Sequence, residues 1–343
     1  MPPRPSFNEL PLRKDGPPGN AWGLFGDNDQ CGTLNLLTPE NVASAAREIV
    51  DGVRVSTDWY LNSMSPPCFG RRAIEHTIKH KTPRTVNDDE LILNTQSSSQ
   101  WDGLRHYGYQ KEKVYYNGVT QHDVMNTNKN GIHGMTSLIF NFSLNQLPVM
   151  NVRWAHETLP AWVEKGGIVG RGVLLDYAAW ADGQGIQIKP FETVSIPSST
   201  LQEVAASQGT KLKAGDILFI RTGWTRGYQD YSSEQRAALA ETLPPPAIGV
   251  ESSEEMLRWI WDHSFAAIAG DHPSMEAWPC QNPDFQLHQW LLAGWGMPIG
   301  ELFDLEELSA ECKKRNRWSF FFSSVPLKVP GGVASPPNGV AIF

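Results

Sequence analysis

Long apolar runs and concentrations of positive charge are both missing from this sequence. No uninterrupted apolar stretch approaches the roughly 18 residues of a membrane helix, and residues 1–20, MPPRPSFNELPLRKDGPPGN, lack a signal-peptide core. Lys and Arg number 29 against 37 Asp and Glu, giving a net charge of -8, and the basic residues are scattered. We therefore expect a soluble, cytoplasmic protein whose partners include neither nucleic acid nor a membrane.

Cysteine is also scarce. The four cysteines are far apart, and no two of them form a CxxC pair; they are Cys31, Cys68, Cys280 and Cys312. This spacing favours four reduced, structural thiols over a disulfide framework or a thiolate zinc site.

The chain does have enough apolar material for a substantial core. Its 343 residues are 40% hydrophobic and 10% aromatic, a length that permits one large domain or two small ones. Thr38 followed by Pro39 is typical of a helix start, and short apolar runs such as GVLLDYAAWA, DILFIRTGW and FAAIAGD are typical of buried strands. Helical spacing recurs in LQEVAASQGTKL and ESSEEMLRWIWDHS, so strands and helices are mixed and we expect an α/β or α+β architecture.

Two segments stand apart from this pattern. The Pro-rich start, residues 1–20, is interpreted as an N-terminal extension, and an apolar, Asn-rich stretch at about 134–154 is interpreted as an insertion.

Polar residues crowd the segment NTQSSSQWDGLRH, residues 94–106, which begins where a strand is predicted to end. Asp102 and His106 lie four residues apart, a spacing that lets a carboxylate and an imidazole meet at one metal ion in a helical or tightly turned chain. Farther along, His288 and Glu301 flank the helix-like QWLLAGWGMPIG and could supply ligands from the other side of a cleft. Considered alone, each pair is more commonly a surface or capping contact.

Several blocks of the sequence, in order, resemble the cyclase family, which includes kynurenine formamidase and isatin hydrolase, and in particular its fungal branch. The blocks are WGLFGDNDQCGTLNLLTPENV, LNTQSSSQWDGLRHYG, GIVGRGVLLDYAAW, DILFIRTGW, AGDHPSMEAWP and LHQWLLAGWGMPIGELFDLEEL. The resemblance runs from about Trp22 to about Leu308, apart from the stretch after Gly134. It implies a single swivelling β/β/α domain over residues 1–343, with a barrel-like mixed sheet, flanking helices and assembly into a homo-oligomer such as a homodimer.

The family's metal signature, H-x-G-T-H-x-D-x-P-x-H, is only partly kept in this sequence. Its first two histidines fall on Gln96 and Gln100, whereas its aspartate and last histidine fall on Asp102 and His106. Because a Gln amide is a much weaker ligand than an imidazole, these two exchanges predict a lower metal affinity. His122, adjacent to Asp123, and His272 are candidates for compensation, although a structural role is the commoner one.

The resemblance implies a manganese or zinc ion and a set of residues for it. The implied metal-site residues are Asp102, His106, His288, Glu301, Gln96 and Gln100. Asp102 and His106 are the implied catalytic residues, and Trp101, Arg105 and Trp278 are candidates for binding substrate. Tyr107 and Arg221 are also near matched blocks.

The implied activity is hydrolysis of an amide, lactam or lactone in a small, often aromatic substrate by a metal-activated water. Two alternatives stay open. The same Asp, His and Glu cluster could run a metal-independent cyclisation, dehydration or isomerisation, or the chain could bind a small molecule without catalysis.

Overall fold

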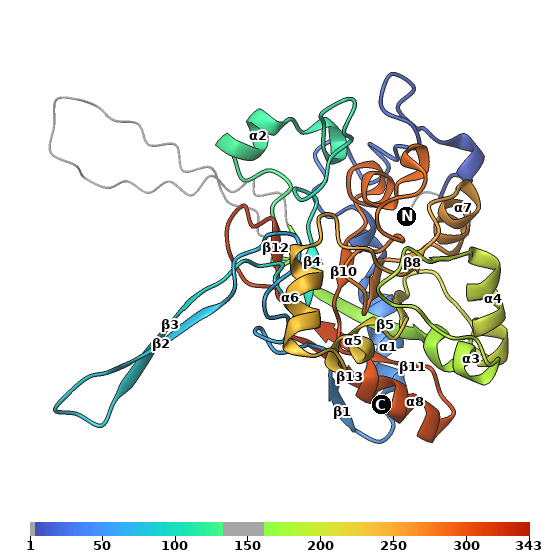
Figure 1. The fold of residues 1–343 in the computed structure, drawn as a ribbon. Coiled ribbons are helices and arrows are strands. Elements are labelled where there is room, and N and C mark those ends of the chain that lie inside the picture. The colour runs from blue at the N-terminus through green and yellow to red at the C-terminus, as the bar shows by residue number, and fades with distance from the viewer. Residues whose placement is uncertain (1–3, 133–160) are drawn as a thin grey trace, which may run out of the picture.

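The computed structural model describes residues 4–132 and 161–343. The interpretation of 134–154 as an insertion therefore lies outside the described residues. Within them, nine strands form one curled, mixed sheet in the order β1-β13-β11-β5-β7-β9-β10-β4-β12 (Figure 1). Its strands are β1 Arg54–Ser56, β13 Gly339–Ile342, β11 Ser319–Ser324, β5 Ile168–Leu175, β7 Ile217–Ile220, β9 Ala267–Gly270, β10 Ile299–Glu301, β4 Gln100–Asp102 and β12 Ala334–Ser335.

The centre of the sheet is parallel and both margins are antiparallel. Strands β5, β7, β9 and β10 pair in parallel, whereas β4 and β12 on one side and β11, β13 and β1 on the other pair antiparallel. Strands β7 and β9 are buried along their whole length, as expected of central strands that are covered on both faces. The sheet is mixed and curled, and helices flank it, so the prediction of a barrel-like mixed sheet with flanking helices is confirmed.

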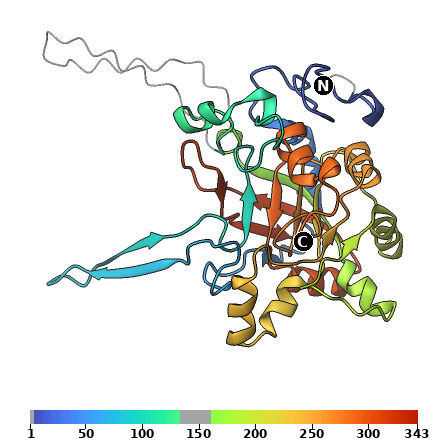
Figure 2. The same ribbon diagram turned by 45° about the horizontal axis from the view of Figure 1, so that its top comes forward.

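Helices lie around the sheet (Figures 1 and 2). The α-helices are α1 Pro39–Ala45, α2 Gln121–Asn126, α3 Tyr177–Gly183, α4 Ser198–Ser207, α5 Trp224–Gln229, α6 Ser233–Glu241, α7 Glu254–His263 and α8 Glu306–Arg315. The shorter or irregular turns are η1 Phe7–Glu9, η2 Gly32–Leu36, η3 Ala46–Glu48, η4 Tyr116–Gly118, η5 Pro283–Phe285 and the π-helix η6 Gln289–Trp295. Within the described ranges no helix combines the length and apolar character needed to cross a bilayer.

Helix starts follow the sequence signals closely. The Thr38 side chain accepts a hydrogen bond from the Asn41 amide at the start of α1, with Pro39 in the first turn, as predicted. The π-helix ends at Trp295 because Gly296 adopts a left-handed conformation with φ 66°, which glycine tolerates without strain.

Two small sheets lie outside the main one. Strands β2 Glu75–His80 and β3 Asn87–Ile92 form a hairpin that is exposed along its whole length and projects from the body (Figures 1 and 2). Strands β6 Ser195–Ile196 and β8 Gly249–Val250 form a second, parallel pair. Strand β3 ends at Ile92, just before the polar segment 94–106, and a turn separates it from β4.

The Pro-rich segment at the N-terminus packs on the body of the protein. Phe7 is buried, and its ring stacks on Trp290 with centroids 5.9 Å apart. The indole nitrogens of Trp261 and Trp295 donate to the carbonyl oxygens of Pro5 and Gly19, respectively. All four cysteines are reduced thiols, as predicted.

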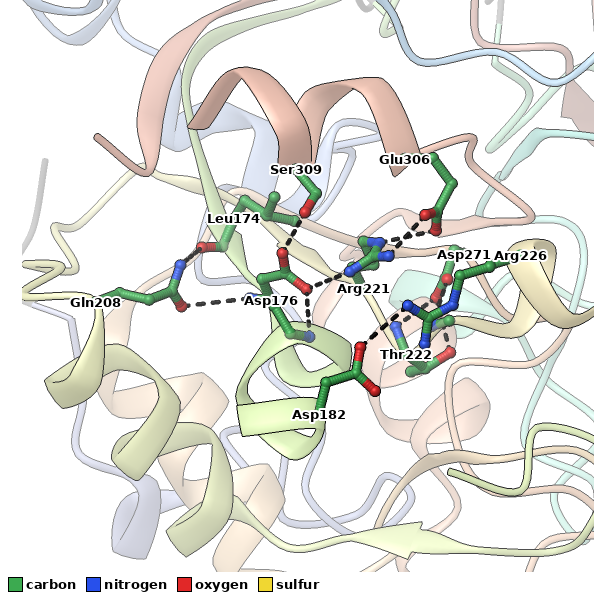
Figure 3. A network of polar contacts seen from close by, with 12 residues as sticks. Leu174, Asp176, Asp182, Gln208, Arg221, Thr222, Arg226, Asp271, Glu306 and Ser309 are labelled. Atoms are coloured by element: carbon green, nitrogen blue, oxygen red, sulfur yellow. Dashed lines mark hydrogen bonds and ion pairs between the residues drawn. The ribbon is translucent and has the colours of Figure 1, made fainter. Parts of the chain in front are cut away.

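Buried charged side chains connect the segments at the carboxyl ends of the parallel strands through hydrogen bonds and ion pairs (Figure 3). Arg221, just after β7, donates to Asp176 at the start of α3 and makes a bidentate contact with Glu306 at the start of α8. Asp176 also accepts a hydrogen bond from Ser309. Asp271, just after β9, accepts from the hydroxyl and amide of Thr222 and from the amides of residues 223 and 224. We call Asp176, Arg221, Glu306, Ser309 and Asp271 the strand-end network; it fixes the chain that leads into residues 272–278.

Candidate active site

Strands β4 and β10 bring two of the predicted site segments face to face. Their antiparallel register sets Gln100 opposite Glu301 and Asp102 opposite Ile299. Because alternate residues of a strand point to opposite faces, Gln100 and Asp102 share one face with Glu301, and Trp101 points the other way. The pairing of β4 with β10 therefore places Gln100, Asp102 and Glu301 together in one half of the site.

Trp101 is consequently a core residue. Its side chain is fully buried, its ring contacts Phe303 edge to face, and its indole nitrogen donates to the Ser324 hydroxyl at 3.0 Å. Arg105 is also directed elsewhere, since its guanidinium donates to the carbonyl oxygens of Gly331 and Thr127. Neither residue lines the pocket described below, so the structure does not support the prediction that they bind substrate.

The other half of the site comes from His288, at the entry to the π-helix. Its Nδ1 lies 2.7 Å from Glu276 Oε2, and its Nε2 lies 3.2 Å from Glu301 Oε1. Burial alone would lower the pKa of His288, but the Glu276 and Glu301 carboxylates raise it well above its ordinary value. His288 in turn holds the pKa of Glu276 below its usual range, against the effect of burial. The two side chains thus form a buried ion pair.

His106 and Glu301 have pKa values shifted in opposite directions. Burial lowers the pKa of His106, although the Asp102 carboxylate, whose Oδ2 lies 3.7 Å from His106 Nε2, partly opposes the shift. Burial raises the pKa of Glu301, and the negative charge of Asp102 raises it further. A neutral imidazole and a protonated carboxyl group are the forms of a general base and a general acid, respectively.

The two glutamines at the positions of the family's histidines turn their amide nitrogens toward the carboxylates. Gln96 Nε2 donates to Asp102 Oδ1 at 2.7 Å and lies 3.2 Å from His106 Nδ1. Gln100 Nε2 donates to Glu301 Oε2 at 2.9 Å and to Asp102 Oδ1 at 3.2 Å. To coordinate a cation through oxygen, either amide would have to rotate by half a turn.

A metal ion could still be held here by other atoms. Asp102, His106 and His288 each offer a ligand atom, and these atoms lie within 4.8 Å of one another. Glu301 Oε1 is buried 3.2 Å from His288 Nε2, and it would be a further donor atom to an ion bound there. Two imidazoles and two carboxylates are a common ligand set for zinc or manganese. The donor set therefore suits one divalent cation.

The candidates for compensation do not join this group. His122 and Asp123 are on the surface helix α2, where Asp123 forms a capping box with Thr120. His272 is buried, and its Nε2 lies 3.1 Å from the Met275 carbonyl oxygen. Arg221 belongs to the strand-end network.

A pocket of about 180 Å³ opens beside the cluster. Its lining residues are Phe69, Arg71, His106, Tyr107, Pro273, Ser274, Trp278, His288 and Glu301. Trp278 and Tyr107 were candidates from the sequence. Phe69, Arg71, Ser274 and the His288 partner Glu276 were missed, although Ser274 and Glu276 belong to the matched block AGDHPSMEAWP.

Comparisons with known proteins identify what the chain and its fold are similar to. The family model named Cyclase matches residues 67–277. The crystal structure of a novel cyclase is 30% identical, with a TM-score of 0.77, over 94% of this chain and 99% of that one. Isatin hydrolase A from Labrenzia aggregata, bound to benzyl benzoate, is 14% identical with a TM-score of 0.54 over 90% of this chain and 98% of that one. Isatin hydrolase A from Ralstonia solanacearum is 16% identical with a TM-score of 0.54 over 89% and 97%. No curated protein matches the sequence.

Proposed function

The chain belongs to the cyclase family, and from that premise we propose that it is a hydrolase that cleaves a carbonyl C–N or C–O bond in a small, aromatic amide, lactam or lactone. The observation that carries the proposal is the pocket in which His106 and Glu301 lie beside the aromatic rings of Tyr107 and Trp278. Such a pocket combines groups that transfer protons with walls that accept a planar ring.

We assign the metal to the residues whose atoms converge. Asp102, His106 and His288 would hold a manganese or zinc ion, with Glu301 as a further ligand. When bound, the ion supplies a Lewis acid that acidifies water and polarises a carbonyl. The amides of Gln96 and Gln100 make its binding weaker than in a site with imidazoles at those positions.

When no metal ion is bound, two side chains of the pocket suit the proton transfers. His106 is neutral near pH 7 because burial lowers its pKa, so it can take a proton from an attacking water. Glu301, whose pKa is raised by burial and by Asp102, can donate a proton to the departing nitrogen or oxygen.

The His288 cation and the aromatic walls complete the site. When no metal ion is bound, His288, held in place by Glu276, is a fixed positive charge that favours negative charge developing on a carbonyl oxygen in the pocket. The rings of Phe69, Tyr107 and Trp278 would exclude water from around a bound substrate.

A second candidate is metal-independent proton transfer, as in a cyclisation, dehydration or isomerisation. One observation favours it: the amides of Gln96 and Gln100 already donate hydrogen bonds to Asp102 and Glu301. The carboxylates therefore have partners that a metal ion would have to displace or supplement.

Metal content and turnover distinguish these functions. We would measure metal by mass spectrometry on protein purified without chelator, thermal melting with and without Mn or Zn, and turnover of a panel of aromatic amides, lactams and lactones. About one metal per chain, with a higher Tm and metal-dependent hydrolysis, supports the hydrolase. Conversion of a panel compound to an isomer, a cyclised product or a dehydrated product, indifferent to chelator, supports the second candidate. If no compound of the panel is turned over, with or without metal, the hydrolase proposal is wrong and small-molecule binding without catalysis takes its place.

A further inference from the structure

Arg71 is a positive charge in the pocket that makes no direct ion pair within the described residues, although its charge lowers the pKa of Glu301 slightly against the effect of burial. Its Nη1 donates to the Gln96 carbonyl oxygen and to Gln100 Oε1, the latter at 3.3 Å. Its Nε and Nη2 have no hydrogen-bond partner, and the guanidinium forms no ion pair, within residues 4–132 and 161–343. In the same pocket His288 is neutralised by Glu276. Arg71 thus has donors left for a ligand.

Two further donors on the pocket wall lack partners. The Ser274 hydroxyl and the Trp278 indole nitrogen are buried and make no hydrogen bond within the described part of the chain. Both residues line the pocket together with Arg71, and Ser274 is only 4% exposed. Because a buried polar group without a partner costs about 1–3 kcal/mol, a ligand that accepts hydrogen bonds from these groups gains affinity.

The local backbone presents Arg71 to the pocket at an energetic cost. Phe69 has a left-handed conformation with φ 60°, which costs of order 1–3 kcal/mol for a residue other than glycine. Gly70 follows with φ 63°, and the turn sets the Phe69 ring 5.0 Å from the Arg71 guanidinium carbon. An arginine stacked on an aromatic ring is held with less freedom, so it loses less entropy when it binds an anion.

We propose that Arg71, with the Ser274 hydroxyl and the Trp278 N–H, forms an anion subsite that binds a carboxylate on the aromatic substrate. A planar guanidinium with a free edge matches a carboxylate bidentately. Arg105, which the sequence placed nearer to the site, does not line the pocket, and its two terminal nitrogens donate to backbone carbonyl groups. The inference rests on the proposed function for the identity of the pocket, but it concerns binding and not turnover.

Isosteric ligands test the subsite without a reaction. Phenylacetate and phenylacetamide have nearly the same shape, and only the first carries a charge. By isothermal titration calorimetry at neutral pH, we expect phenylacetate to bind about 10- to 100-fold more tightly, as a charge-assisted hydrogen-bonded pair would give. Arg71→Gln should remove this preference and leave phenylacetamide within about twofold of its wild-type affinity. Ser274→Ala should weaken phenylacetate by a smaller factor.

The adjacent Arg72 provides a matched control. It pairs with Glu75 on the surface, so Arg72→Gln removes the same charge one residue away and should leave both affinities unchanged. A urea midpoint equal to that of the wild type would establish that Arg71→Gln is folded. The proposal is overturned if the wild-type protein binds the acid no better than the amide, if the acid does not bind, or if Arg71→Gln weakens both ligands alike.

The result separates this inference from the proposed function. Arg71-dependent binding of the acid, without turnover of any panel compound, keeps the subsite and refutes the hydrolase. Turnover of neutral lactams and amides, with no preference for acids, keeps the hydrolase and refutes the subsite.

Discussion

Two clusters of buried charged side chains lie within this fold, and they differ in whether their hydrogen bonds are complete. In the strand-end network every polar side-chain atom has a partner, and Arg221 is balanced by Asp176 and Glu306 (Figure 3). In the pocket, the Ser274 hydroxyl and the Trp278 indole nitrogen have none within the described residues.

The difference indicates which cluster serves stability and which serves chemistry. Buried charges that are paired and fully hydrogen-bonded hold elements in one arrangement, and removing one partner is strongly destabilising. Groups that are buried without partners reduce stability, but they leave donors and acceptors for a ligand. Changes in the network should therefore affect folding, and changes in the pocket should affect activity and binding.

The largest expected effect is on catalysis. His106→Gln removes the proposed base and should lower kcat/KM by about 10²–10⁴-fold, while the free energy of unfolding changes by less than about 1 kcal/mol. Steady-state kinetics and urea unfolding measure the two quantities. The same substitution at His122, on the exposed helix α2, should change neither. A His106→Gln protein with normal kcat/KM would show that the base is another group.

The next effect is on stability. Asp271 accepts hydrogen bonds from the backbone amides of residues 223 and 224. In Asp271→Asn, the side-chain NH2 group would face these backbone N–H groups if it took the place of Oδ2, and two donors cannot form a hydrogen bond. We expect a loss of about 3 kcal/mol in the free energy of unfolding by urea. Asp182→Asn is the matched control, because Asp182 pairs with Arg226 at the surface and should contribute less than about 1 kcal/mol. Equal losses in the two variants would contradict the role given to the network.

A smaller gain should follow from restoring the family's ligands. The double change Gln96→His and Gln100→His replaces two amides by imidazoles and should tighten zinc or manganese binding by about 10- to 100-fold. Competition with a chromogenic chelator measures this affinity. Gln121→His, on the surface, controls for adventitious binding by an added histidine. An unchanged affinity would mean that the two glutamines do not limit metal binding.

The sequence predicts the framework of the fold well because its signals are local. The cap at Thr38 and the apolar runs of β5, β7 and β9 depend on neighbouring residues alone. The orientation of Trp101 could also be predicted from the sequence. If Gln100 and Asp102 face the cleft, the alternation of side chains along a strand turns Trp101 away from it.

The pocket walls could not be predicted in the same way, because they come from segments far apart in the chain. Arg71 contacts Gln96 and Gln100 only after the hairpin β2–β3 has returned the chain, and no spacing in the sequence indicates this. Arg105, close to His106 in sequence, is drawn toward Thr127 and Gly331 instead. Convergence of Asp102 and His106 with His288 was predicted from the family resemblance and not from their separation along the chain.

The final prediction is that the two clusters respond to pH with opposite signs. Burial opposes the ionisation of Asp271, but His272 and Thr222 lower its pKa below the ordinary 3.8, so its contribution to stability is present above that value and is lost as the pH falls through the folded-state pKa. The pKa of Glu301 is raised above the ordinary 4.5, so its contribution to stability is present at low pH and is lost as the pH rises through the folded-state value.

Urea unfolding over a pH series, with a chelator present, measures both effects. The loss of unfolding free energy caused by Asp271→Asn should become smaller as the pH falls. The free energy of unfolding of Glu301→Gln, relative to wild type, should rise toward neutral pH. Each unit of pKa shift corresponds to about 1.4 kcal/mol, and slopes of the same sign in both variants would refute the distinction between the clusters.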